Sequence, residues 1–214
     1  MNWASIFVFF VVTLSIFSNS VQSPPNPVYK STPKAAINSK HVNADAQYET
    51  SSSDVPSYNV ANINTYQVII SYIMDNYKQV YLADVLTIAE NTVSICSEYN
   101  IDPLFITALL AVESEFNRYA ISPSGAKGLG QLMPFNLKIY KVSDPFDAQQ
   151  NIRGTVRMVK ELMDMWKGDT SYALASYFEG ENAIKRNKGN PFSTKTAGYV
   201  YQVLNKYNSI KQYL

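Results

Sequence analysis

The sequence predicts a mainly α-helical domain over residues 62–214. Apolar residues in this region recur every three or four positions, which is the spacing of one buried helix face. Helix-start signals are present as well, as at Asp102-Pro103, because an aspartate side chain caps free N–H groups and proline has none to lose. No segment alternates apolar and polar residues as a half-buried strand does. A hydrophobic content of 46% is sufficient for a buried core.

Three helices are expected before residue 115. The first two each carry an apolar stripe, made of Val68, Ile69, Tyr72, Ile73 and Tyr77 in one and of Leu82, Val85, Leu86, Ala89, Val93 and Cys96 in the other. The third begins at Pro103 and is apolar on every side from Leu104 to Val112, apart from Thr107. A helix that is apolar all round is buried in the centre of a domain. It leads directly into Glu113-Ser114-Glu115.

A loop and three more helices are expected after the central helix. Residues 122–130 contain a proline and three glycines, a composition typical of a loop. Asp147 is expected to cap a long helix whose apolar stripe runs from Ile152 to Trp166. A short helix over about residues 169–178 and a last helix over residues 193–213 complete the predicted domain.

Residues 1–20 are predicted to be a secretory signal peptide, so that the protein is exported. Residues 3–17 are almost wholly apolar and a small polar run, Ser18-Asn19-Ser20, follows them. This apolar run is shorter than the ~20 residues of a membrane-spanning helix, so no stable membrane insertion is expected after cleavage. No lysine or arginine precedes the run, which leaves an uncleaved anchor as the alternative.

Residues 21–61 are predicted to be a disordered linker. They are rich in serine, asparagine and proline and show no sustained apolar period. Such a segment buries too little apolar surface to offset its chain entropy. We therefore expect it to act as a tether between the signal peptide and the helical domain.

The overall composition excludes several function classes. A net charge of +1 is far from the dense basic field that nucleic-acid binding needs, so no nucleic-acid partner is expected. Cys96 is the only cysteine, and its place in an apolar stripe predicts a buried side chain. His41 is the only histidine and lies in a polar stretch. One cysteine and one histidine are too few to build an intramolecular disulfide, a CxxC site, a histidine triad or a histidine metal site. No metal or organic cofactor is expected.

Glu113 is the residue on which the chemistry is expected to depend. Ile106, Leu109 and Leu110 share its helix face, so Glu113 emerges from the core where the helix ends. Burial and the negative end of the helix dipole both disfavour the charged carboxylate. A raised pKa would keep Glu113 protonated near neutral pH as a general acid; the alternative is a solvated charge at a helix end. Glu115 points to a different side and is expected to be solvated or structural.

Several stretches beginning just before Glu113 resemble one known family. They read AVESEFN at 111–117, AISPSGAKGLGQLMP at 120–134, DPFD at 144–147, NI at 151–152 and ALASY at 173–177. In order and spacing they resemble the catalytic stretch of the soluble lytic transglycosylases. The resemblance implies a lysozyme-like fold for residues 62–214 and cleavage of the β-1,4 bond between N-acetylmuramic acid and N-acetylglucosamine. Peptidoglycan glycan strands are then the expected partner, in the periplasm or cell envelope.

The resemblance also implies roles for individual residues. Glu113 would protonate the glycosidic oxygen and then, as a carboxylate, accept the proton of the muramic C6 hydroxyl, which closes onto C1 as a 1,6-anhydro ring. An internal hydroxyl replaces water, so no second carboxylate is needed. The positions expected at the substrate are Ser114, Gln131, Met133, Asn151 and Tyr177. For Met133 the alternative is plain core packing, and for Asn151 it is packing near the site without direct contact. Gln131 would offer its amide to the sugar, and the Tyr177 hydroxyl would reach Glu113; for Ser114 the alternative is a local backbone bond.

Two positions depart from the family pattern. Gly130 replaces a methionine, which would remove an apolar wall from the cleft, and Phe178 replaces the asparagine after the tyrosine, which would remove a hydrogen-bonding amide. Three alternatives therefore stay open. One is a hydrolase resembling goose-type lysozyme, with a helper carboxylate such as Asp144 or Asp147. The others are a non-catalytic glycan-binding protein of the same fold and a membrane-anchored structural protein.

Overall fold

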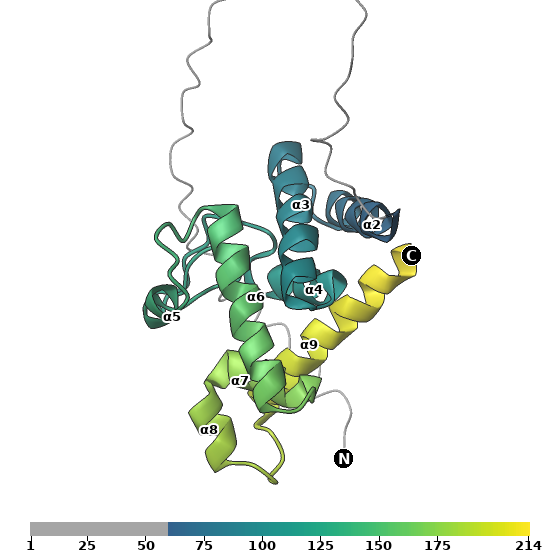
Figure 1. Cartoon of the computed structure of the whole chain (residues 1–214). Coiled ribbons are helices and arrows are strands. Elements are labelled where there is room, and N and C mark those ends of the chain that lie inside the picture. The colour runs from purple at the N-terminus through teal and green to yellow at the C-terminus, as the bar shows by residue number, and fades with distance from the viewer. Residues whose placement is uncertain (1–59) are drawn as a thin grey trace, which may run out of the picture. The chain divides into compact units, whose positions relative to one another are not determined.

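The computed structural model describes residues 60–214, and these are mostly helical (Figure 1). Its elements are α2 (Val60–Asn76), α3 (Leu82–Tyr99), α4 (Pro103–Ser114), α5 (Pro134–Ile139), α6 (Ala148–Met165), α7 (Thr170–Glu179), α8 (Glu181–Arg186), α9 (Thr194–Ile210) and the short 3-10 helix η2 (Lys211–Tyr213). Within this part of the chain the β-type pairing consists of isolated bridges in the loop after α4. The predicted fold class is therefore confirmed. The predicted signal peptide, His41 and nearly all of the predicted linker lie outside the described residues.

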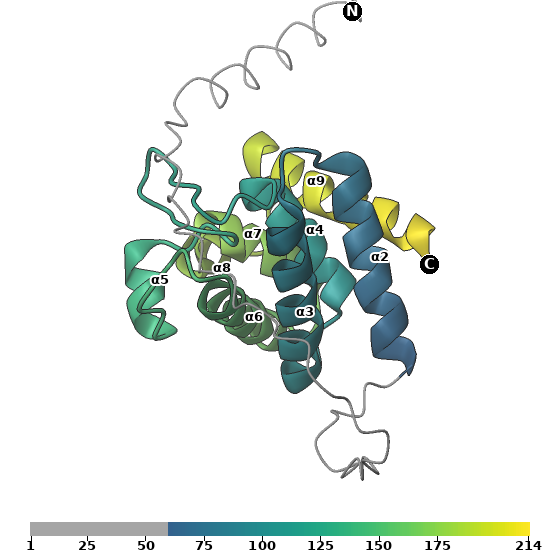
Figure 2. The ribbon, with the colours of Figure 1, turned by 90° about the horizontal axis from the view of Figure 1, so that it is seen from above.

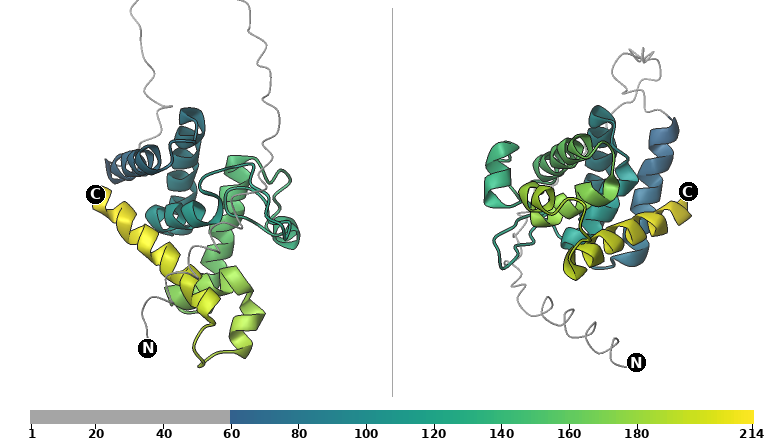
Figure 3. Two further views of the ribbon diagram at one scale, coloured as in Figure 1. Left: turned by 180° about the vertical axis from the view of Figure 1, so that it is seen from behind. Right: turned by 90° about the horizontal axis from the view of Figure 1, so that it is seen from below.

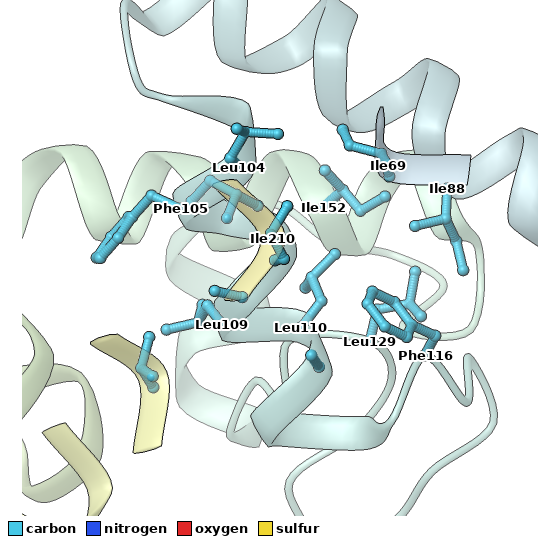
Figure 4. Packing of buried hydrophobic residues seen from close by; sticks show 14 of the residues in the cluster. Ile69, Ile88, Leu104, Phe105, Leu109, Leu110, Phe116, Leu129, Ile152 and Ile210 are labelled. Atoms are coloured by element: carbon cyan, nitrogen blue, oxygen red, sulfur yellow. The ribbon is translucent and has the colours of Figure 1, made fainter. Parts of the chain in front are cut away.

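The central helix α4 begins and is buried as the sequence predicts. Asp102 Oδ1 accepts a 2.8 Å hydrogen bond from the backbone N–H of Leu104, and Pro103 is the first helical residue. Every residue from Leu104 to Ala111 is buried, and α2, α3 and α9 all pack against this helix. Figure 4 shows apolar side chains of the surrounding elements gathered around α4, among them Ile69, Ile88, Leu129, Ile152 and Ile210. Each large side chain buried in this way contributes about 1.5–3 kcal/mol.

Helices α6 and α7 join this group through α3 and α9, and α8 joins it through α7. Helix α3 packs against α2 and α6, and α7 packs against α6, α8 and α9; Figure 2 shows α2, α3 and α6 side by side. Asp147, Asp169 and Ser193 cap α6, α7 and α9 through their side chains. Cys96 is fully buried in α3, as predicted, and burial raises the pKa of its thiol. No helix within residues 60–214 has the length and apolar character needed to cross a membrane.

Helix α9 runs antiparallel to α4, and hydrogen bonds join the two helices at both ends of α4. Tyr207 Oη donates a 2.5 Å hydrogen bond to Asp102 Oδ2, just before α4 begins. Beyond Tyr207, the ring of Tyr213 packs edge-on against Tyr72 of α2, with 5.7 Å between centroids. Figure 3 shows the C-terminal end of α9 beside α2 and its other end near α7. This placement brings the first turns of α9 to the C-terminal end of α4.

The chain turns sharply away from the helix axis after α4. Glu115 and Phe116 both adopt left-handed backbone conformations, with φ of 50° and 62°. A residue with a side chain in that region costs about 1–2 kcal/mol. Phe116 is 1% exposed and its ring packs edge-on against Tyr77, 4.8 Å between centroids, which offsets that cost. The turn ends α4 immediately after Glu113 and Ser114.

Candidate active site

Glu113 occupies the last turn of α4, where the core ends, and its side chain is partly exposed. The hydroxyl of Tyr199, from α9, donates a 2.5 Å hydrogen bond to Glu113 Oε1. Burial raises the pKa of Glu113 to about 7, against the opposing effect of the Tyr199 hydrogen bond. The predicted rise in pKa is confirmed. A carboxyl group with this pKa can donate a proton and then accept one near neutral pH.

Tyr199 is the site residue that the sequence analysis missed. Its side chain is 8% exposed, and burial followed by the charge of Glu113 raises the pKa of its hydroxyl well above the ordinary value. The hydroxyl is therefore a hydrogen-bond donor over the whole physiological pH range. A signal was present, since Tyr199 is an aromatic on the face of the last helix that also carries Val203 and Ile210, both fully buried. Nothing in the sequence alone says which buried group such a tyrosine meets.

Tyr177 does not donate to Glu113, and the prediction that its hydroxyl does so is wrong. Tyr177 Oη donates a 2.5 Å hydrogen bond to the backbone carbonyl of Gly130. A phenol has one proton, so this bond uses the donor that the prediction assigned to Glu113. The two groups are still electrostatically coupled, because burial and then the Glu113 charge raise the pKa of Tyr177 well above its ordinary value. Tyr177 thus fixes the glycine-rich loop next to the site.

Asn151 is a scaffold residue of that loop. Its side chain is 0% exposed. Oδ1 accepts a 2.8 Å hydrogen bond from the N–H of Gly130, and Nδ2 donates to the carbonyls of Lys127, at 3.1 Å, and Pro145, at 2.9 Å. With both ends of the amide engaged and no exposed surface, Asn151 has the geometry of a residue that packs near the site, which was the alternative to direct contact with substrate. Gly128 shows how tightly the loop is held, since a Cβ there would lie 2.1 Å from the Pro145 carbonyl oxygen.

Ser114 lies next to Glu113 at the end of α4, and Gln131 and Met133 follow the glycine-rich loop. The polar groups of Ser114 and Gln131 are partly used by the protein itself. Gln131 Nε2 donates to the carbonyls of Ala120, at 3.1 Å, and Gly128, at 2.9 Å, so the group left for a ligand is its side-chain carbonyl. Ser114 Oγ donates to the Leu110 carbonyl at 3.2 Å, which is the local backbone bond named as the alternative. Met133 is half-buried directly before α5. Contact of these residues with substrate stays a prediction.

The two departures from the family pattern are both accommodated by neighbouring side chains. A Cβ at position 130 would lie 1.9 Å from Thr155 Oγ1, so Thr155 fills the space at Gly130 where an open gap was expected. Phe178 stacks on Tyr199, with ring centroids 4.6 Å apart and an interplanar angle of 18°. The loss of an amide at position 178 is thus accompanied by a ring contact with the residue that holds Glu113.

Glu113 is not paired with a second carboxylate among the interactions of the described residues. Glu115 is exposed beyond the helix end, as expected for a solvated charge. Asp147 Oδ1 accepts from the N–H of Gln150, at 2.9 Å, to cap α6, and Asp144 Oδ1 accepts from the N–H of Phe146, also at 2.9 Å. Both aspartate side chains therefore accept hydrogen bonds from backbone N–H groups close to them in the chain.

A central apolar helix that ends in one carboxyl group of raised pKa, packed against further helices and bordered by a glycine-rich loop, defines a lysozyme-like helical domain. The family described as the transglycosylase SLT domain matches residues 93–200, and the chain belongs to this family. The resemblance found in the sequence is thereby confirmed. It covers the end of α3, all of α4 to α8 and the first turns of α9, including both Glu113 and Tyr199.

Curated relatives are similar over parts of their length. A transglycosylase of Enterobacteria phage PRD1 is 33% identical over 112 residues, which are 52% of this chain and 40% of the phage protein. The membrane-bound lytic murein transglycosylase F of Vibrio cholerae is 37% identical over 78 residues, 34% of this chain and 15% of that protein. This chain therefore spans less than half the length of either relative.

Solved structures show the same fold. The 70 kDa soluble lytic transglycosylase of Escherichia coli superimposes with a TM-score of 0.53 at 21% identity, over 68% of this chain and 29% of that one. A complex of the 70 kDa soluble lytic transglycosylase with bulgecin A gives a TM-score of 0.54 at 20% identity. At these identities the likeness concerns the arrangement of helices.

Proposed function

We propose that this protein is a peptidoglycan lytic transglycosylase, which cleaves the β-1,4 bond between N-acetylmuramic acid and N-acetylglucosamine and leaves a 1,6-anhydro end. The observation that carries the proposal is the pairing of Glu113 with Tyr199 at the end of a buried apolar helix. It supplies one carboxyl group whose pKa of about 7 suits both an acid and a base. Membership of the transglycosylase SLT domain family supports the same reaction.

In the first step the protonated Glu113 gives its proton to the glycosidic oxygen. The bond from this oxygen to C1 of the muramic residue breaks, the N-acetylglucosamine leaves as an alcohol, and positive charge develops at C1. Tyr199 donates to Oε1 of Glu113, so the proton transferred to the substrate is the one on Oε2. The same hydrogen bond stabilises the carboxylate that forms as the proton leaves, because hydrogen bonds to a charged group are the stronger ones.

In the second step the Glu113 carboxylate accepts the proton of the muramic C6 hydroxyl. The C6 oxygen attacks C1 and closes the anhydro ring, which returns Glu113 to its protonated form. No water is consumed, so neither a second carboxylate nor a positioned water is required. Asp144 and Asp147 hydrogen-bond to nearby backbone N–H groups, which is consistent with this scheme, since a hydrolase of this kind would favour a helper carboxylate at the cleft.

The proposed substrate supports a location outside the cytoplasm. A chain that acts on peptidoglycan must meet the glycan strands in the periplasm or cell envelope, and the predicted signal peptide would take it there. Several relatives are named membrane-bound lytic murein transglycosylases, which supports an envelope location for this chain. Export followed by cleavage near residue 20 is therefore part of the proposal.

The proposal is tested by incubating purified peptidoglycan with the full-length chain and measuring the release of soluble muropeptides. Glu113→Gln should lower the rate by at least about a hundredfold, since general acid catalysis contributes roughly that much or more. Glu115→Gln is the matched control, because Glu115 is exposed and only two residues away, and it should keep the wild-type rate. Equal release by wild type and Glu113→Gln would refute the assignment, and no release by wild type from several walls would favour a glycan-binding protein.

A further inference from the structure

The end of α7 holds the start of α9 through two consecutive residues. Phe178 stacks on Tyr199 at 4.6 Å between centroids, and Lys195 Nζ lies 5.2 Å from the centre of the Phe178 ring. Glu179 accepts hydrogen bonds from Ser193 Oγ, at 3.1 Å, and from Thr196 Oγ1. All three partners of α9 and the cap residue Ser193 lie within its first two turns. We call this set of contacts the α7–α9 clamp.

The α7–α9 clamp contacts Glu113 through a single intermediate residue, Tyr199. Tyr199, which Phe178 contacts through its ring face, is the residue whose hydroxyl donates to Glu113 Oε1 at 2.5 Å. Rotation about χ1 swings the ring of a tyrosine and carries its hydroxyl through a wide arc, whereas rotation about χ2 leaves the hydroxyl oxygen on the rotation axis. A near-parallel stack at 18° restrains both the tilt and the rotation of that ring.

We propose that Phe178 is a positioning residue for the reaction: its ring holds the ring of Tyr199 so that the Tyr199 hydroxyl stays on Glu113. Glu179 assists by anchoring the first turn of α9 through Ser193 and Thr196, with its negative charge at the positive end of that helix. Phe178 itself needs no contact with the substrate. The effect on rate rests on the proposed function, whereas the effect on the state of Glu113 does not.

The hydrogen bond from Tyr199 lowers the pKa of Glu113, so weakening it raises that pKa. The titratable groups that interact with the Glu113 charge in the described residues are Tyr199 from α9 and Tyr177 from α7, and both stay neutral below pH 10. Phe178→Leu removes the stack but keeps an apolar side chain of similar volume. It should therefore raise the pKa of Glu113 in the same direction as Tyr199→Phe, and by less.

Phe178→Leu should also lower the rate of muropeptide release. A stacked ring pair contributes an amount that corresponds to roughly a two- to tenfold change in an equilibrium, so Phe178→Leu should lower kcat/KM by about that factor and move its alkaline limb to higher pH. Phe178→Tyr keeps the stack and should match wild type. Phe192→Leu is the matched control, because Phe192 packs on Tyr172, 5.1 Å between centroids, in a ring pair that does not include Tyr199.

The deciding experiment is an NMR titration of the full-length chain labelled with carbon-13 at the glutamate carboxyl, with the Glu113 signal assigned by its loss in Glu113→Gln. We expect a higher pKa of Glu113 in Tyr199→Phe and in Phe178→Leu, and no further rise when the two are combined. Phe178→Met gives a second test if the leucine variant does not fold. An unchanged pKa in Phe178→Leu and Phe178→Met, beside a raised one in Tyr199→Phe, would overturn the proposal.

This readout needs no turnover. If wild type releases no muropeptides, the proposed function fails while the titration still decides whether Phe178 positions Tyr199. If wild type is active and the Phe178 variants keep both its pKa and its pH profile, the positioning role fails while the function stands.

Discussion

Replacing Tyr199 with phenylalanine removes the hydroxyl that holds Glu113 and leaves the ring and its stack on Phe178 in place. A hydrogen bond to a charged group contributes about 1.5–3 kcal/mol. The bond is stronger once Glu113 is a carboxylate, so most of this energy is lost in the transition state of the first step. At 1.36 kcal/mol for each factor of ten, kcat should fall by about ten- to a hundredfold.

Tyr199→Phe should also shift the pH dependence of kcat/KM to higher pH. The first step needs protonated Glu113, so kcat/KM should decline above the pKa of about 7. The Tyr199 hydrogen bond lowers this pKa, and without it the decline should begin at higher pH. The assay is the rate of muropeptide release between pH 5 and 10 for wild type and Tyr199→Phe.

Tyr201→Phe provides the control, because Tyr201 is in the same helix and 70% exposed. It should behave as wild type in rate and in pH profile. If Tyr199→Phe keeps the wild-type kcat and the same alkaline limb, the Tyr199 hydroxyl contributes nothing to the reactivity of Glu113, contrary to the role proposed for it.

Three further predictions concern stability, measured by thermal or denaturant unfolding of the full-length chain. Folding raises the pKa of Glu113 from 4.5 to about 7. The protonated Glu113 side chain therefore makes its full contribution to the free energy of unfolding below pH 4.5, and this contribution is lost as the pH rises through 7. The stability of Glu113→Gln relative to wild type should therefore increase by up to about 3 kcal/mol across that window, and parallel pH curves would contradict this. Asn151→Ala should cost about 2–4 kcal/mol, because it leaves the N–H of Gly130 and the Pro145 carbonyl without partners and removes one of the two hydrogen bonds to the Lys127 carbonyl. Gly130→Ala should cost about 1–3 kcal/mol through its clash with Thr155, and Thr155→Ala in the same chain should recover part of it; equal losses in the single and double variants would show that the clash is relieved elsewhere.

The parts of the fold that the sequence predicted are those governed by local physics. The Asp102-Pro103 start of α4 and the cap at Asp147 depend on a side chain and a backbone group three residues away or less. The all-round apolar pattern of α4 depends only on composition, and it correctly indicated a buried central helix. Helices α5 and α8 were not predicted, because six residues are too few to show an apolar period.

The candidate site was predicted in part for a similar reason. Glu113 could be found because its burial follows from its own helix. Its partner could not, because Tyr199 is 86 positions away and meets Glu113 only through the packing of α9 on α4. Tyr177 was assigned to Glu113 from its motif, yet its hydroxyl is used by the Gly130 carbonyl. A motif identifies which residues gather at a site, whereas the pairing of donors with acceptors is decided by packing.

The reaction proposed for Glu113 brings an internal hydroxyl, and not water, to the muramic C1. It is tested most directly by digesting peptidoglycan in water enriched in heavy oxygen and analysing the released muropeptides by mass spectrometry. Transglycosylation predicts anhydro ends that are one water lighter than reducing ends and carry no heavy oxygen from the solvent. Reducing ends that contain solvent oxygen, formed by wild type and absent with Glu113→Gln, would show that Glu113 activates water and would contradict the account.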